Sequence, residues 1–73
     1  MEKVSLREND EFIKLGQAMK KAGLEESGAD AKNDILDGLV KVNGEVEKRR
    51  GRKLYPGDEA VFYDNIIRIG HDT

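Results

Sequence analysis

The stretch Gly38-Leu39-Val40-Lys41-Val42-Asn43-Gly44-Glu45-Val46-Glu47 decides the fold of this chain. Upstream of it, apolar residues recur at helical spacing, whereas from Val40 onward they alternate with polar residues, as in a strand with one buried face. Asn43-Gly44 is a strong hairpin signal, because both central positions of a type I′ turn need positive φ. The sequence therefore predicts a helix that ends near Gly38, followed by a hairpin of residues 40–42 and 45–47.

Two helices are predicted upstream of this hairpin. The first has a start signal at Asn9 or Asp10 and a stop signal at Gly23. The second begins at a capping box, residues 27–30, in which Ser27 caps the helix and Asp30 reaches back. The linker between them is short, so we expect the helices to be neighbours in space. Their apolar rows are Phe12, Leu15, Met19 and Ala22 in the first, and Ala31, Ile35 and Leu39 in the second.

Short strands are predicted downstream of the hairpin. Residues 60–63 and 66–69 are rich in aromatic and β-branched residues, and Asp64-Asn65 between them is a tight-turn signal. Pro56-Gly57 is typical of a type II turn. The order of elements predicts an α+β fold with two N-terminal helices packed on a small antiparallel sheet of short strands. At 73 residues the chain has the size of one domain, which we assign to residues 1–73.

The composition excludes several classes of function. The chain has no cysteine and one histidine, His71, so disulfides, thiolate metal sites and catalysis by His or Cys lack their residues. It has no glycine-rich phosphate loop of recognised type. No apolar run approaches the roughly 20 residues of a membrane span. We therefore expect a cytoplasmic protein that is not an enzyme and has no catalytic residues, metal, cofactor, membrane contact or small-molecule substrate.

Charge is distributed unevenly along the chain. The net charge is −2 at pH 7, yet residues 41–53 carry six basic and two acidic side chains. Five of these six lie in Lys48-Arg49-Arg50-Gly51-Arg52-Lys53, which we call the basic loop. A solvated charge run is the simpler interpretation for two or three charges, but five in six positions would repel one another without a partner. Because guanidinium groups bind phosphates bidentately, the basic loop predicts a phosphate-bearing partner.

Two weaker signals precede the basic loop. The start of the second helix presents backbone N–H groups at the positive end of the helix dipole, and Ser27 and Lys32 would face an anion bound there. Capping alone also explains Ser27. Asn43 is first of all a turn residue, although its amide is also able to donate to a ribose or a phosphate.

With these residues in place, the sequence resembles a known family. The segments LGQAMKKAG (15–23), SGADAK (27–32) and GLVKVNG (38–44) are similar to the S4 RNA-binding domain, named for ribosomal small-subunit protein four. The segments RRGRKL (49–54) and Gly57-Asp58 resemble its compact stand-alone bacterial branch, the YbcJ-like and YaaA-like proteins. The similarity covers residues 12 to about 63. It implies two helices against a small antiparallel sheet, and an RNA surface that runs from the second helix start across the following strand and hairpin.

Carried onto this sequence, the resemblance implicates the following residues in RNA binding: Ser27, Lys32, Lys41, Asn43, Lys48, Arg49, Arg50, Arg52 and Lys53. One departure concerns the second helix start, where Gly28 stands at a position that is Arg in many family members. We expect this difference to weaken phosphate contact there and to shift more of it to the basic loop.

These observations lead to one hypothesis and one alternative. The hypothesis is a monomeric, non-enzymatic RNA-binding protein that recognises structured RNA by its shape and phosphate positions. By analogy with the family, its target would be ribosomal RNA or a ribosomal assembly intermediate. The alternative is a protein-interaction adaptor that docks an acidic partner through the same basic loop.

Overall fold

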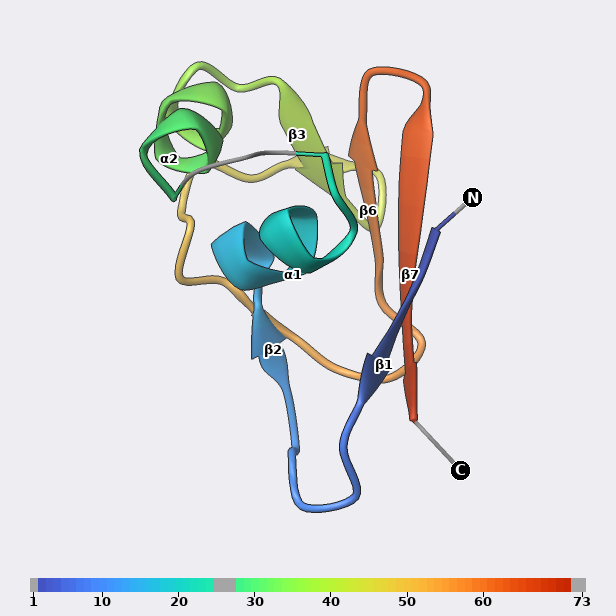
Figure 1. The fold of residues 1–73 in the computed structure, drawn as a ribbon. Coiled ribbons are helices and arrows are strands. Elements are labelled where there is room, and N and C mark those ends of the chain that lie inside the picture. Colours follow the sequence, from blue (N-terminus) through green and yellow to red (C-terminus); the bar gives the residue numbers. More distant parts are fainter. Residues whose placement is uncertain (1, 25–27, 72–73) are drawn as a thin grey trace.

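The computed structural model describes residues 2–24 and 28–71 of the chain (Figure 1). Two helices accompany a five-stranded sheet and a separate two-stranded sheet, so the predicted α+β class is confirmed. In chain order the elements are β1 (Glu2–Leu6), β2 (Ile13–Lys14), α1 (Leu15–Lys21), α2 (Gly28–Leu36), β3 (Val40–Val42), β4 (Glu45–Val46), β5 (Lys53–Leu54), β6 (Glu59–Phe62) and β7 (Asn65–His71).

The main sheet is mixed, with strand order β1-β7-β6-β3-β4. All of its pairs are antiparallel except β1 and β7, which run parallel with Val4 opposite Ile69. The prediction of a purely antiparallel sheet that follows two N-terminal helices is therefore wrong at this edge. The missed strand does carry a signal, because Val4 and Leu6 are buried and alternate with Lys3 and Ser5.

The predicted turns explain how the strands connect. Asn43 and Gly44 have φ of 51° and 88°, as a type I′ hairpin turn requires. Gly57 has φ of 97°, and the Asp58 N–H donates to the Tyr55 carbonyl at 2.9 Å, which confirms the type II turn. The third turn lies one residue earlier than predicted. Phe62 pairs with Asn65, and Tyr63 adopts a φ of 54°, so Tyr63 and Asp64 form its centre.

The first helix is shorter than the sequence predicts, because it begins at Leu15 instead of near Asp10. The preceding residues are drawn into other contacts: Ile13 pairs with Leu54 in the β2–β5 sheet, and the Phe12 ring packs 6.0 Å from that of Tyr55. The predicted stops are confirmed, since Gly23 and Gly38 have φ of 77° and 79° just beyond their helices. The predicted capping contacts of Ser27 and Asp30 lie outside what the structure describes.

The core lies between one face of the main sheet and the helices (Figure 1). Along β3, buried Val40 and Val42 alternate with exposed Lys41, and β6 and β7 alternate in the same way. We call the face that carries the buried side chains the inner face and the opposite one the outer face. The buried apolar residues are Val4, Leu6, Leu15, Ala18, Met19, Ile35, Val40, Val42, Leu54, Ala60, Phe62, Ile67 and Ile69.

Candidate nucleic-acid interface

The basic loop is fastened to the start of α1 by its backbone. The N–H groups of Leu15 and Gly16 donate to the carbonyls of Arg52 and Arg50 at 2.9 and 3.0 Å. The first N–H groups of a helix have no partner inside the helix, so the loop carbonyls satisfy two of them. Within the loop, the Arg52 N–H donates to the Arg49 carbonyl at 3.2 Å and closes a turn. The basic loop therefore has a defined backbone position, and its side chains project from a fixed base.

Glu47 supplies a carboxylate that the sequence analysis did not connect with the basic loop. It is 7% exposed, and one of its oxygens lies 3.1 Å from the Arg49 guanidinium and 2.9 Å from that of Arg52. Its other oxygen accepts from Arg49 Nε at 3.1 Å and from the Arg49 backbone N–H at 3.2 Å. Two of the five basic residues of the loop, Arg49 and Arg52, therefore already have an acidic partner within the fold. The signal was present, because Glu47 directly precedes the run.

These contacts change the protonation of the carboxylate. The hydrogen bond from the Arg49 side chain, supported by that from Arg52, lowers the pKa of Glu47 from 4.5 to about 2, although burial acts in the opposite direction. Glu47 therefore stays ionised throughout the physiological pH range. A guanidinium has five N–H donors, so Arg49 and Arg52 keep others that do not face Glu47. The Arg49 side chain is 74% exposed, which leaves it accessible to a further anion.

The remaining cations of the basic loop point into solvent. Lys48, Arg50 and Lys53 are exposed, and none forms an ion pair within the described part of the chain. The Lys53 ammonium lies 4.9 Å from the centre of the Phe12 ring, a cation–π arrangement that orients it. The basic loop thus combines two arginines held by Glu47 with three cations that have no acidic partner there.

The structure adds residues of α1 that the sequence analysis did not select. A hollow of about 350 Å³ lies between the start of α1 and the basic loop. Its lining joins two cations from α1 and its cap to one from the loop, and consists of Lys14, Gly16, Gln17, Lys20, Arg50 and Gly51. The sequence signal was the spacing of Lys14, Gln17 and Lys20 along one side of the helix, off the apolar row.

Asn43 has its amide group occupied by internal hydrogen bonds. Its Nδ2 donates to Asp58 Oδ1 at 3.1 Å, and its Oδ1 accepts from the Glu59 backbone N–H at 3.0 Å. The second oxygen of Asp58 accepts from the Tyr55 N–H at 2.7 Å. The segments VKVNG (40–44) and Gly57-Asp58 thus form one hydrogen-bonded unit. This unit ties the β3–β4 turn to the turn before β6.

The other predicted site residues are not gathered at the basic loop. Lys41 alternates with buried Val40 and Val42, so its side chain lies on the outer face of the sheet. Lys32 is an exposed residue of α2. Ser27 lies outside the described residues. The structure therefore places the basic loop against the start of α1 through Arg50 and Arg52, whereas the side chain of Lys48 lies near Gly38, just after α2.

Residues 2–24 and 28–71 also bear on metal binding and on membrane insertion. No group of three or more His, Cys, Asp or Glu side chains in these ranges could hold a metal ion. Neither helix in them is long and apolar enough to cross a bilayer.

Comparison with known families and proteins gives one family and close relatives. The family model described as "S4 domain" matches residues 4–70. The chain is 50% identical over 48 residues to the "probable ribosome maturation protein RlbA" of Bacillus subtilis (strain 168), which is 66% of this chain and 68% of that protein. It is 37% identical over 57 residues to the "putative RNA-binding protein YbcJ" of Escherichia coli (strain K12), which is 78% of this chain and 81% of that protein.

Proposed function

This chain belongs to the S4 domain family, and we propose that it binds structured RNA through the basic loop and the adjoining side of α1, without catalysing a reaction. The family match and the printed names of the two relatives support RNA binding in general. The finer proposal, which concerns the surface and the mode of recognition, depends on the geometry of this chain.

The observation that carries the proposal is the fixed shape of the basic loop. Two backbone hydrogen bonds attach it to α1, and Glu47 holds two of its arginines. Cations that are ordered before binding lose less conformational entropy when they meet phosphates. The positive electrostatic field of the loop also dominates near its surface, because charges farther away than about 8 Å are largely screened at physiological salt. The acidic remainder of the chain therefore has little influence at the contact.

We further propose that the protein reads the shape and phosphate positions of the RNA. Single-stranded bases are commonly read by stacking on exposed aromatic rings. Tyr55 is 46% exposed but packs against the Phe12 ring, and Tyr63 lies at the β6–β7 turn, which Figure 1 shows at the end of the sheet away from β2. The side chains in the proposed interface are mainly cations, which suit phosphates. Lys14, Lys20, Lys48, Arg49, Arg50, Arg52 and Lys53 are the proposed contacts.

The name of the Bacillus relative directs the choice of RNA. It refers to ribosome maturation, so we propose ribosomal RNA, free or in an assembly intermediate, as the target in the cytoplasm. The protein would act as a monomer, because a single surface holds all of the proposed contacts.

The test compares two variants that remove one positive charge each. Arg50→Gln removes an exposed cation of the basic loop, whereas Lys3→Gln removes one from the outer face of the sheet. Binding to a fluorescent ribosomal RNA hairpin and to an unrelated hairpin is measured by anisotropy at several salt concentrations. With about four or five phosphate contacts, log K of the wild type should fall with log salt at a slope of roughly −3 to −4.

We expect Arg50→Gln to weaken binding to both hairpins by about three- to tenfold and to reduce the slope by almost one unit. Lys3→Gln should change affinity by less than about twofold, since a remote exposed charge is screened. A loss confined to one hairpin would contradict shape and phosphate recognition. Displacement of labelled RNA by an unrelated acidic protein as readily as by unlabelled RNA would favour the adaptor alternative.

A further inference from the structure

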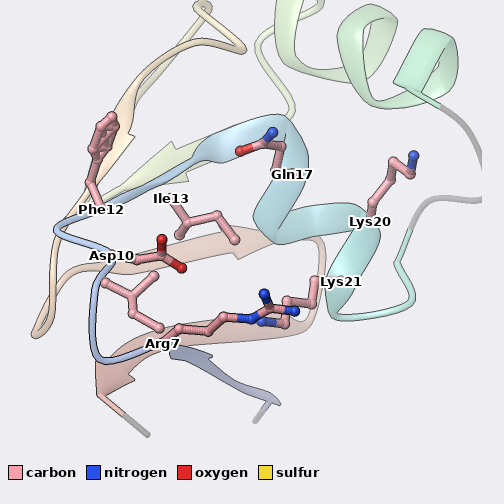
Figure 2. A pocket seen from close by; sticks show the side chains of 8 residues that line it. Arg7, Asp10, Phe12, Ile13, Gln17, Lys20 and Lys21 are labelled. Atoms are coloured by element: carbon pink, nitrogen blue, oxygen red, sulfur yellow. The ribbon is translucent and has the colours of Figure 1, made fainter.

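A second hollow also lies against α1, next to the loop between β1 and β2. It has a volume of about 520 Å³ and is lined by Leu6, Arg7, Asp10, Phe12, Ile13, Gln17, Lys20 and Lys21 (Figure 2). The proposed function makes no use of Arg7 or Lys21. The sequence gives no reason to join Arg7 with Lys21, because thirteen residues separate them. The fold brings both side chains to one hollow, because Arg7 extends from the end of β1 toward α1 (Figure 2).

Like charges meet in this hollow. Figure 2 shows the Arg7 side chain extended along the hollow toward the end of α1 that carries Lys21, and both side chains line it. The Lys21 ammonium donates to the Ser5 carbonyl at 3.0 Å, which fixes its position. Neither cation forms an ion pair with any of the residues the structure describes. Cations that line the same hollow repel one another, and an anion bound in the hollow would be attracted to each of them.

The lining of the hollow also includes a negatively charged residue. Asp10 contributes one carboxylate, so three cations and one anion face the hollow, with a net charge of +2. Asp10 forms no ion pair with these cations among the described residues. Its negative charge should therefore oppose any anion that binds there, and its removal should favour binding. This opposite effect provides an independent test.

The hollow is continuous with the proposed interface. Gln17 and Lys20 line both this hollow and the one beside Arg50, so the two share a wall made by α1. The seven residues of α1 span about 10 Å. An RNA strand that contacts the basic loop could therefore continue over the helix within a few nucleotides. Its phosphodiester groups would meet Lys20 and then Arg7 and Lys21.

We infer that the Arg7–Lys21 hollow binds a backbone phosphate of the RNA, so that the interface extends from the basic loop across α1 to the β1–β2 loop. This inference rests on the proposed function, because the phosphate belongs to the same RNA. It assigns a role to Arg7 and Lys21, beside the already proposed contact Lys20, and so adds at least one phosphate contact to the interface.

The experiment uses the full chain and the same fluorescent ribosomal RNA hairpin. Arg7→Gln is compared with Lys3→Gln, which removes the same charge from the neighbouring strand but from its outer face. Asp10→Asn is compared with Asp64→Asn, which removes a negative charge at the β6–β7 turn. All four replaced side chains are exposed, and thermal melts establish that each variant is folded.

Arg7→Gln should weaken binding about three- to tenfold and reduce the salt slope by almost one unit, whereas Lys3→Gln should do neither. Asp10→Asn should tighten binding by about two- to fivefold, and Asp64→Asn should have little effect. If Arg7→Gln behaves like Lys3→Gln while Arg50→Gln still weakens binding, the inference is overturned and the proposed function stands. If the wild type binds no RNA at low salt, both are overturned.

Discussion

The basic loop and the turn between β3 and β4 lie a few residues apart, yet their polar side chains serve different ends. At the turn, Asn43 and Asp58 bond to each other and to backbone N–H groups. In the basic loop, Glu47 binds two arginines but leaves most of the cationic surface toward solvent. Both regions resemble the family motif in sequence. Only the structure shows that one is bonded internally and the other faces outward.

The comparison also shows two uses of a carboxylate. Asp58 is half-buried and accepts hydrogen bonds from groups that build the turn, so its carboxylate stabilises the fold. Glu47 is almost fully buried, and it fixes the direction of guanidinium groups that belong to the outer surface. An acidic residue inside a predicted RNA-binding region can therefore strengthen that region by ordering it, although it lowers the net charge.

The largest effect on stability is expected from Glu47→Gln. The variant loses charge-assisted hydrogen bonds to Arg49 and Arg52 and leaves these two cations beside a neutral group. We expect the free energy of unfolding to fall by about 2 kcal/mol, as measured by urea denaturation at pH 7. The matched control is Glu45→Gln, which changes the charge equally at an exposed residue of β4. Equal stability of the two variants would show that Glu47 does not hold the basic loop.

The pH dependence of stability tests the same role of Glu47. The folded-state pKa of Glu47, about 2, lies below its ordinary value of 4.5, so its ionised form favours the folded state. Its contribution is fully present above about pH 4.5 and is lost as the pH falls toward 2. Urea midpoints measured between pH 7 and pH 2.5 should therefore drop more for the wild type than for Glu47→Gln. Parallel curves for the two proteins would contradict this assignment.

The elements that could be read from the sequence are those fixed by local chemistry. Asn43-Gly44, Pro56-Gly57 and the helix stops at Gly23 and Gly38 all follow from backbone conformations that few residues adopt. The errors involve contacts distant in sequence. β1 depends on pairing with β7, at the other end of the chain, and α1 is shortened because Ile13 pairs with Leu54. Local patterns do not specify which distant partner a strand will find.

The same distinction applies to the candidate site. The basic loop was visible as a run of charge, and the structure places that run at one surface. Lys14 and Lys20 were present as off-row helix residues, but their proximity to Arg50 depends on the docking of the loop on α1. The partner of Arg49 and Arg52 was one residue outside the run and was buried, so charge counting could not assign it. The sequence did not indicate which residues of different helices, strands and loops lie close together.

Asn43→Ala should have the next largest effect, and it should act on the fold alone. It removes both amide hydrogen bonds and places alanine at a φ of 51°, so we expect a loss of about 1.5 kcal/mol. A double-mutant cycle with Asp58→Ala should give a coupling energy of about 1 kcal/mol. RNA affinity, measured at a temperature where the variant is folded, should match that of the wild type. A tenfold loss of affinity there would mean that Asn43 contacts RNA as well.

The smallest effects concern two glycines, Gly44 in the β3–β4 turn and Gly16 in α1, against which the basic loop packs. Gly44 has φ of 88° in the turn, so Gly44→Ala should cost about 1 kcal/mol even though a methyl group there meets no neighbour within 4 Å. Gly16 lies under the basic loop, and a Cβ there would be 3.6 Å from Arg50 Cβ, an ordinary contact. Gly16→Ala should therefore stay within about 0.5 kcal/mol of the wild type, because the gain in helix propensity offsets small adjustments.

The two glycine variants separate backbone conformation from packing. Gly16→Ala should also leave RNA affinity and its salt slope unchanged, since the carbonyls of Arg50 and Arg52 still accept from α1. A bulkier change, Gly16→Leu, should displace the loop from the helix and weaken RNA binding while the hairpin turn stays intact. Thermal melts and anisotropy titrations on the three variants measure both effects. If Gly16→Leu bound RNA as tightly as Gly16→Ala, the fastening of the loop to α1 would contribute nothing to recognition, and charge alone would account for binding.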